Sequence, residues 1–192
     1  MPSTGHKIII IAAPSGAGKT SVTRHLLAAL PDKLEFSVSC ATRKPRNNER
    51  DKVDYYFITV DEFQKKIQSE DFVEWEMVYE GKYYGTLKSE LHRIWEKNKY
   101  PLLDVDVQGG IHVQAIFPKQ TLSLFIEPPS ITELERRLRA RGTETEESLQ
   151  ARIKKASHEM EFKNQFDKII INDSLQRACE EAELAVREFL KP

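Results

Sequence analysis

A glycine-containing segment near the N-terminus restricts the fold of this chain more than any other feature. An apolar run from Ile8 to Ala12 precedes the segment, and a helical pattern from Ser21 to Leu30 follows it. Between them the sequence reads Ala13, Pro14, Ser15, Gly16, Ala17, Gly18, Lys19, Thr20. Strand, glycine turn, Lys-Thr and helix in this order form a P-loop arrangement. The chain is therefore predicted to begin with a strand–loop–helix unit of an α/β protein.

The residue types of this segment suit the binding of an anion. Gly16 and Gly18 let the backbone wrap closely around a ligand, so that N–H groups point inward at the positive end of the next helix. Lys19 can place its charge on the β- and γ-phosphates of a nucleotide, and the Thr20 hydroxyl can bind Mg²⁺.

One position departs from the usual pattern, which opens with glycine where this chain has Ala13. The rest of the motif, Gly-x-Gly-Lys-Thr, is intact and stands between a strand and a helix. An ordinary strand-to-helix turn is the alternative, but it does not explain a lysine directly after Gly18. We therefore interpret residues 13–20, extended to Ser21, as a site for nucleotide phosphates.

Apolar runs along the chain indicate a layered fold. Runs at residues 8–13, 102–107, 122–126 and 169–171 predict buried strands. Helical patterns follow them at residues 21–30, 110–117, 131–140 and 175–190. Wholly apolar strands that alternate with helices are typical of a parallel sheet covered on both faces. We predict an α/β P-loop fold of three layers, with ligands beyond the carboxyl ends of the strands.

Residues 36–97 interrupt the alternation with a segment rich in aromatic and charged side chains. The pattern indicates short strands and one helix near residues 61–69, with Asp61 as its N-cap. The segment is long enough to form an inserted substrate lobe. The core is then expected from residues 1–35, 98–135 and 163–192.

Residues 136–162 form a second interruption, which concentrates positive charge. Runs of charge usually mark a solvated helix face, and Arg136 and Arg139 fit that alternative because they share a face. A P-loop enzyme that transfers phosphoryl groups, however, needs mobile cations that close over the phosphates. We therefore predict an arginine-bearing lid, with candidate cations Arg137, Arg141 and Arg152.

Two aspartates stand at the end of an apolar strand. Asp104 and Asp106 are two residues apart, which places both side chains on one face of the strand. Carboxylates in this position near a P-loop commonly support Mg²⁺ or its waters. The alternative, that one of them caps the next helix, stays open for either residue.

Composition limits the partners and the compartment. The 192 residues carry 29 Lys and Arg against 30 Asp and Glu, and this balance argues against a general nucleic-acid or membrane-surface protein. No run approaches the ~20 apolar residues of a membrane span, and the N-terminus does not resemble a signal peptide. Cys40 and Cys179 suggest reduced thiols. We expect one cytoplasmic domain without an obligate protein partner.

Further segments of the chain combine with the P-loop into a longer pattern. They are FSVSCATRKPR (36–46), DYYF (54–57), FVEW (72–75), YYGT (83–86), LDVDVQG (103–109), RGTETEES (141–148) and IND (171–173). Taken in this order with the P-loop, they resemble guanylate kinase of the bacterial type over nearly the whole chain. In bacterial-type members the P-loop also opens with alanine.

The resemblance implies the reaction ATP + GMP → ADP + GDP with Mg²⁺, carried out by a core, a GMP-binding lobe and a lid. By motif, the residues that hold the GMP phosphate are Arg43, Arg46, Tyr55 and Tyr84. Those that recognise guanine are Ser39, Glu74 and Thr86. Those that act on the transferring phosphoryl group are Lys19, Arg43, Arg137, Arg141 and Arg152. Asn172 is placed near adenine, Asp104 at GMP or Mg²⁺, and Asp106 with Thr20 at Mg²⁺.

The chemistry of the residues agrees with this resemblance. The acceptor is itself an anion, so cations are needed on both sides of the reaction. Guanine offers two adjacent N–H donors, which the carboxylate of Glu74 can accept together. No side chain that reads the 2′-hydroxyl is evident, so dGMP is also expected as a substrate.

Two other functions stay open on the sequence. Some guanylate-kinase-like domains are binding modules of scaffold proteins and would be expected to lack parts of the P-loop or lid. Here Lys19, Thr20 and Arg152 are all present. A P-loop kinase for a different small acceptor is the second alternative, against which Glu74 and Ser39 argue.

Overall fold

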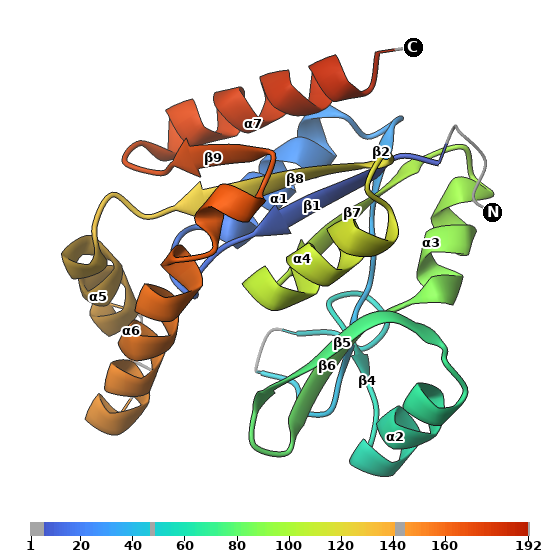
Figure 1. Cartoon of the computed structure of the whole chain (residues 1–192), viewed down its shortest axis with the longest axis horizontal. Helices are drawn as coiled ribbons and strands as arrows, with labels where there is room; N and C mark the ends of the chain where they lie inside the picture. Colours follow the sequence, from blue (N-terminus) through green and yellow to red (C-terminus); the bar gives the residue numbers. More distant parts are fainter. Residues whose placement is uncertain (1–5, 47–48, 141–144, 192) are drawn as a thin grey trace.

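The core is a parallel sheet. The computed structural model describes residues 6–46, 49–140 and 145–191. All neighbouring strands of the sheet run parallel, which confirms the predicted α/β fold (Figure 1). In spatial order its five strands are β2 (Leu34–Phe36), β7 (Tyr100–Val105), β1 (Ile8–Ala12), β8 (Thr121–Glu127) and β9 (Lys168–Ile171).

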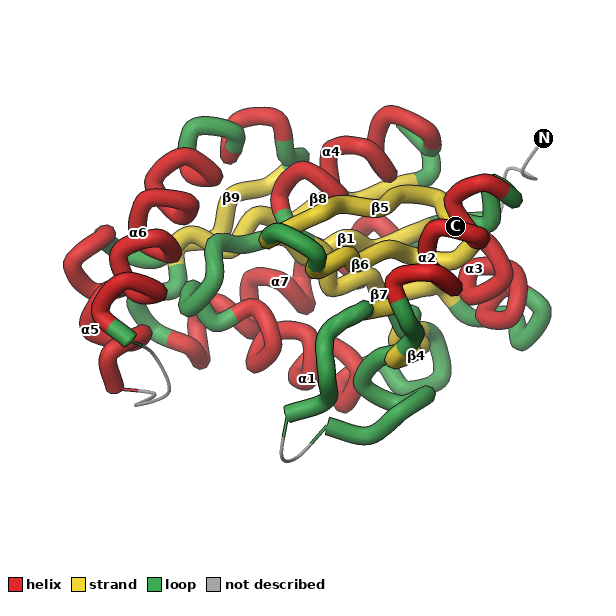
Figure 2. The backbone as a smooth tube through the Cα atoms, turned by 90° about the horizontal axis from the view of Figure 1, so that it is seen from below, coloured by secondary structure: helices red, strands yellow, loops and turns green. Residues whose placement is uncertain are grey.

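Helices cover both faces of this sheet, with α4 on one side and α1 and α7 on the other (Figure 2). Ile9 and Ile11 of β1 belong to the apolar cluster of α1 (Lys19–Ala29) and α7 (Leu175–Phe189). Ile8 and Ile10 point the other way, where their cluster includes Leu91 of α3 (Lys88–Trp95) and Val113 of α4 (Val107–Ile116). Because both faces are covered, β1 is apolar at every position.

The inserted segment forms a smaller lobe with its own sheet. Figure 1 shows it below the core. In spatial order its strands are β4 (Tyr56–Phe57), β3 (Cys40–Ala41), β6 (Lys82–Leu87) and β5 (Phe72–Tyr79). Its apolar cluster joins this sheet to α2 (Val60–Gln68), where the rings of Phe63 and Phe72 stack 4.4 Å apart.

The N-cap of α2 differs from the prediction. Thr59, not Asp61, caps the helix: its hydroxyl accepts from the backbone N–H of Glu62. The Glu62 side chain in turn accepts from the Thr59 N–H at 2.8 Å, so two terminal donors are satisfied reciprocally. Asp61 lies in the first turn instead, so its assignment as the cap was wrong.

Two further helices follow β8. They are α5 (Ile131–Ala140) and α6 (Glu146–Met160), followed by a short 3₁₀ helix (Lys163–Gln165). Leu138 of α5 and Leu149 of α6 belong to the same apolar cluster as Ala13 and Ala17 of the P-loop. The helical pair is therefore anchored at its base beside the phosphate-binding loop.

The end of β7 also differs from the prediction. The strand ends at Val105 rather than at residue 107, and α4 begins at Val107 rather than at residue 110. Asp106 causes the change, because its carboxylate accepts from the Gly109 N–H at 2.8 Å and starts the helix early. No helix within the described residues is long and apolar enough to cross a membrane.

Candidate active site

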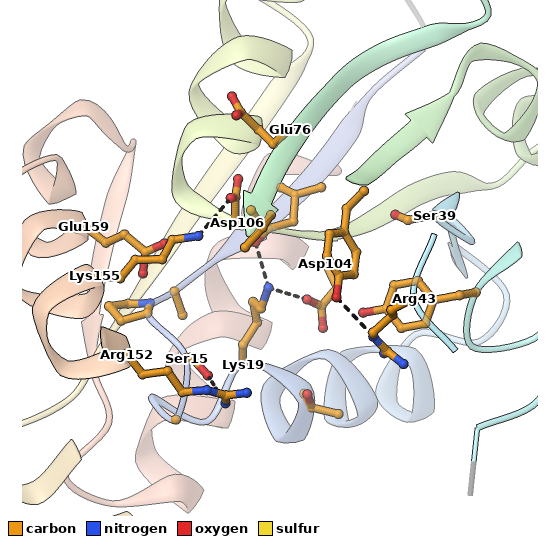
Figure 3. A pocket seen from close by; sticks show the side chains of 18 of the residues that line it. Ser15, Lys19, Ser39, Arg43, Glu76, Asp104, Asp106, Arg152, Lys155 and Glu159 are labelled. Atoms are coloured by element: carbon orange, nitrogen blue, oxygen red, sulfur yellow. Dashed lines mark hydrogen bonds and ion pairs between the residues drawn. The ribbon is translucent and has the colours of Figure 1, made fainter. Parts of the chain in front are cut away.

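A cavity of about 300 Å³ lies between the P-loop, the carboxyl end of β7, the lobe sheet and α6 (Figure 3). Most of the residues predicted for the site line it. They are Ala13, Pro14, Ser15, Gly16, Gly18, Lys19, Thr20, Ser21, Ser39, Arg43, Arg46, Tyr55, Glu74, Tyr84, Asp104, Asp106 and Arg152. Ala17, Thr86, Arg137 and Asn172 do not line it, and Arg141 lies outside the described residues.

The backbone of the P-loop needs both of its glycines. Gly16 and Gly18 have φ values of 97° and 103°, in the left-handed region that favours glycine. A β-carbon at Gly18 would also lie 2.2 Å from the amide nitrogen of Asn172. The conformation turns the loop into the start of α1, where helix N–H groups are available to an anion.

Asn172 has a partner that the sequence did not suggest. Its side-chain nitrogen donates to the Ala17 carbonyl at 2.7 Å, and the residue is buried. This contact ties the P-loop to the residue that follows β9. The predicted role of Asn172 near adenine remains a prediction.

Lys19 is held at the carboxyl end of β7. Its Nζ lies 2.5 Å from Asp104 Oδ1 and donates to the Val105 carbonyl at 2.7 Å (Figure 3). Burial alone would lower the pKa of Lys19, but the carboxylate of Asp104 more than offsets that effect and the pKa is raised. The amine of Lys19 therefore remains charged, and Lys19 lines the cavity.

Asp106 serves as a helix cap, one of the two alternatives open from the sequence. One of its carboxylate oxygens accepts from Gly109, and the other lies 3.6 Å from Lys155 Nζ. Asp104 makes no such cap and pairs with Lys19 instead. The two aspartates thus have different partners: a helix N-terminus and Lys155 for Asp106, and Lys19 for Asp104.

Three charged residues of the cavity were missed from the sequence. Glu76 comes from β5, while Lys155 and Glu159 come from α6 (Figure 3). Lys155 and Glu159 lie three and seven positions beyond Arg152, so all three share one face of the helix. That spacing could have identified them from the sequence. If Arg152 faces a site, the residues three and seven positions further along the helix face the site too.

Glu74 is a buried carboxylate at the lobe side of the cavity. Its side chain accepts from the Thr86 hydroxyl at 2.7 Å, and only 7% of the residue is exposed. Burial raises the pKa of Glu74 to about 7, and nearby Asp106 adds to the effect. The close approach of α4 explains the burial, since a β-carbon at Gly109 would lie 2.7 Å from Glu74 Oε2.

The guanidinium group of Arg43 is held by several side chains of the lobe. Its guanidinium donates to both oxygens of Glu49, at 2.5 and 2.7 Å, and to the Tyr84 hydroxyl at 3.0 Å. It also lies 5.0 Å from the centre of the Tyr55 ring. The hydrogen bonds from Arg43 lower the pKa of Glu49, which also accepts from the backbone N–H of Arg46. Glu49 was not predicted from the sequence.

The arginines of α5 and α6 divide into two groups. Arg136 and Arg139 form exposed pairs with glutamates of the same helices, as expected for a solvated face. Arg137 also pairs with Glu133 of its own helix, at 2.8 Å, but in addition donates to the backbone carbonyl of Asn172 at 3.0 Å. Arg152 reaches the P-loop, where it donates to the Ser15 hydroxyl at 3.2 Å.

Comparison with known proteins decides the family. The family model described as guanylate kinase matches residues 5–189. The chain belongs to the guanylate kinase family. A curated guanylate kinase from Bacteroides fragilis is 44% identical over 184 residues, which cover 96% of this chain and 90% of that protein. One from Salinibacter ruber is 45% identical over 183 residues, which cover 95% and 96%.

A solved structure agrees with this assignment. The crystal structure of guanylate kinase from Anaplasma phagocytophilum matches with a TM-score of 0.77 at 27% identity, covering 97% of this chain and 87% of that chain. As a member of the guanylate kinase family, the chain is a nucleoside monophosphate kinase, with ATP as phosphoryl donor and GMP as acceptor.

Proposed function

We propose that the cavity brings ATP and GMP together and transfers the γ-phosphoryl group of ATP to the GMP phosphate. The observation that carries this proposal is the position of two separate cation sets on one cavity, Lys19 on the P-loop and Arg43 with Arg46 on the lobe. Two phosphate groups repel each other, and cations on both sides offset that repulsion. Catalysis then requires position and charge stabilisation, without a protein nucleophile.

On the ATP side, the backbone of residues 13–21 would hold the phosphates, with Lys19 on the transferring group. Thr20, Asp104 and Asp106 supply oxygen ligands of the kind that Mg²⁺ prefers. Mg²⁺ would bind between these oxygens and the nucleotide phosphates and would neutralise charge on the phosphate oxygens.

On the GMP side, Glu74 would accept from both N–H donors of the guanine edge, beside Ser39. The Thr86 hydroxyl already donates to Glu74, so Thr86 would orient the carboxylate that reads the base. The GMP phosphate would bind among Arg43, Arg46 and the hydroxyls of two tyrosines, Tyr55 and Tyr84. Arginine suits this role because its planar group can contact two phosphate oxygens at once. We expect dGMP to be accepted as well.

The lid would supply the remaining cations. Arg152 already contacts the P-loop, and Arg137 donates to the backbone carbonyl of Asn172. Arg141 joins them by its place in the motif. The parts would be the core (1–35, 98–135 and 163–192), the GMP lobe (36–97) and the lid (136–162), in a cytoplasmic enzyme.

A coupled assay tests this function against its alternatives. The purified chain would be assayed with ATP, Mg²⁺ and each nucleoside monophosphate in turn. We expect turnover with GMP and dGMP far above that with AMP, CMP or UMP. A preference for another acceptor would identify a different kinase. If none of the nucleoside monophosphates is phosphorylated, a binding module would be favoured.

The affinity for GMP should depend on pH through Glu74. Its carboxylate must be ionised to accept from guanine, and its pKa is about 7 before that contact forms. We expect the Kd for GMP to rise about tenfold from pH 8 to pH 6, because binding must then first remove a proton. Calorimetric titrations at both pH values measure this. Because the GMP phosphate also titrates near this range, the control is Glu74→Gln, whose Kd should vary much less.

Both nucleotides together should make the protein more compact. The lobe sheet and α6 both line the cavity, and Figure 1 shows the lobe and the α5–α6 pair as separate parts beside the core sheet. Each can move about short connections. Small-angle scattering with a bisubstrate analogue should give a smaller radius of gyration than the protein alone, and GMP alone should give a smaller decrease. An unchanged radius with the analogue would contradict closure.

A further inference from the structure

Another buried carboxylate lies outside the cavity, in the first turn of α3. Glu90 is 3% exposed. The helix begins at Lys88, directly after β6 and two residues beyond Thr86. In Figure 1, α3 stands where the chain passes from the lobe back to the core sheet. A buried carboxylate is costly unless it is fully hydrogen-bonded, so its partners indicate what it holds in place.

The partners of Glu90 come from separate segments. Its Oε2 accepts from the backbone N–H of Val38 at 3.0 Å, and its Oε1 accepts from the Tyr56 hydroxyl at 2.7 Å. Arg93, one turn further along α3, donates to both oxygens at 2.9 Å. Arg93 also pairs with Glu35 of β2, so the network reaches the edge of the core sheet.

The network keeps its charges at neutral pH. Burial would raise the pKa of Glu90, but the donors from Arg93, Val38 and Tyr56 lower it below its ordinary value. Burial and the bond to Glu90 raise the pKa of Tyr56 to about 12, so its hydroxyl keeps its proton. Each donor and acceptor therefore remains in the form that the contacts require.

Two of the groups bonded to Glu90 are direct neighbours of Ser39, one of the residues proposed to recognise guanine. Val38 precedes Ser39 in the segment that leads from β2 of the core to β3 of the lobe. The backbone N–H of Tyr56 donates to the Ser39 carbonyl at 2.9 Å. The residue before Ser39 and the strand paired beside it are thus both tied to Glu90.

We propose that Glu90 is a positioning residue for the guanine site, which fixes the Val38–Ser39 backbone at the junction between core and lobe. The proposal rests on the function proposed above. Glu90 does not line the cavity, so its effect falls on GMP binding and not on the chemical step. Loss of the network lets Ser39 shift from the guanine edge while Lys19 and the P-loop keep their geometry.

Two variants and one control test the proposal. Glu90→Gln leaves one acceptor oxygen where Val38 and Tyr56 each need one, and Tyr56→Phe removes a single hydroxyl. The matched control is Glu96→Gln, an exposed glutamate at the end of the same helix. We expect the KM for GMP to rise about five- to tenfold in Glu90→Gln and about threefold in Tyr56→Phe. The kcat at saturating GMP and the KM for ATP should stay within about twofold of wild type in both, and Glu96→Gln should match wild type.

The outcomes separate this role from a merely structural one. A structural role would lower the melting temperature and the active fraction, and thus the apparent kcat, while the KM for GMP stays unchanged. That result in the folded variants would overturn the proposal. If Glu90→Gln does not fold, Tyr56→Phe decides by the same criterion. Failure of the wild-type chain to phosphorylate GMP would instead refute the proposed function.

Discussion

Lys19→Met should lower kcat by roughly 10³-fold or more and leave the fold intact. Lys19 is the P-loop cation, and its amine is held by Asp104 and the Val105 carbonyl at the end of β7. Methionine keeps much of the side-chain length and removes the charge. The loss should fall on the chemical step, because negative charge on the phosphoryl oxygens is stabilised there. Single-turnover kinetics at saturating ATP and GMP measure the effect.

The control for this variant is Lys65→Met, which removes an exposed lysine from α2 of the lobe. It should show wild-type kcat, and both variants should show the circular dichroism spectrum of the wild type. A kcat close to wild type in Lys19→Met would mean that the P-loop does not act on the transferring group.

Glu74→Gln should reduce kcat/KM for GMP by roughly ten- to a hundredfold. An amide has one acceptor oxygen, and its NH₂ group would face a guanine donor. The adenine edge differs, since N1 accepts and the 6-amino group donates. We therefore expect the ratio of GMP to AMP activity to narrow without efficient use of AMP. Measurement of kcat/KM for both acceptors in both proteins gives this ratio.

The stability of Glu74→Gln separates a binding effect from unfolding. The pKa of Glu74 is about 7 in the folded chain and 4.5 as an ordinary glutamate, so its ionisation costs stability as the pH rises between these values. At pH 8 the neutral amide should therefore be no less stable than the wild type. An unchanged ratio of GMP to AMP activity in a stable variant would show that Glu74 does not read the base.

Much of the core could be predicted from the sequence because its signals are local. β1 is apolar on both faces, and α7 repeats its apolar residues with helical spacing. The P-loop could be predicted for the same reason, since Gly16, Gly18 and Lys19 act through backbone conformation and charge within a few residues.

The remaining features depend on contacts between distant segments or on competing local ones. Asp106 could equally cap a helix or bind a metal, because both roles use the same carboxylate oxygens. The cap of α2 could have been found from Thr59 and Glu62, but Asp61 offers a similar signal. A glutamate such as Glu90 is usually solvent-exposed on a helix, and only the fold shows that it is buried. The contact of Asn172 with Ala17 joins residues far apart in sequence.

The pairing of the two main cations has a consequence for selectivity. Lys19 and Arg43 each have a carboxylate partner within the chain, Asp104 and Glu49. An entering phosphate must therefore replace or share an internal counter-ion, and it gains only the difference between the two interactions. Inorganic phosphate and sulfate make no contacts beyond those of the anionic group itself. A nucleotide adds the contacts of its base, so we expect the site to bind its nucleotide substrates in preference to small anions that share only their charge.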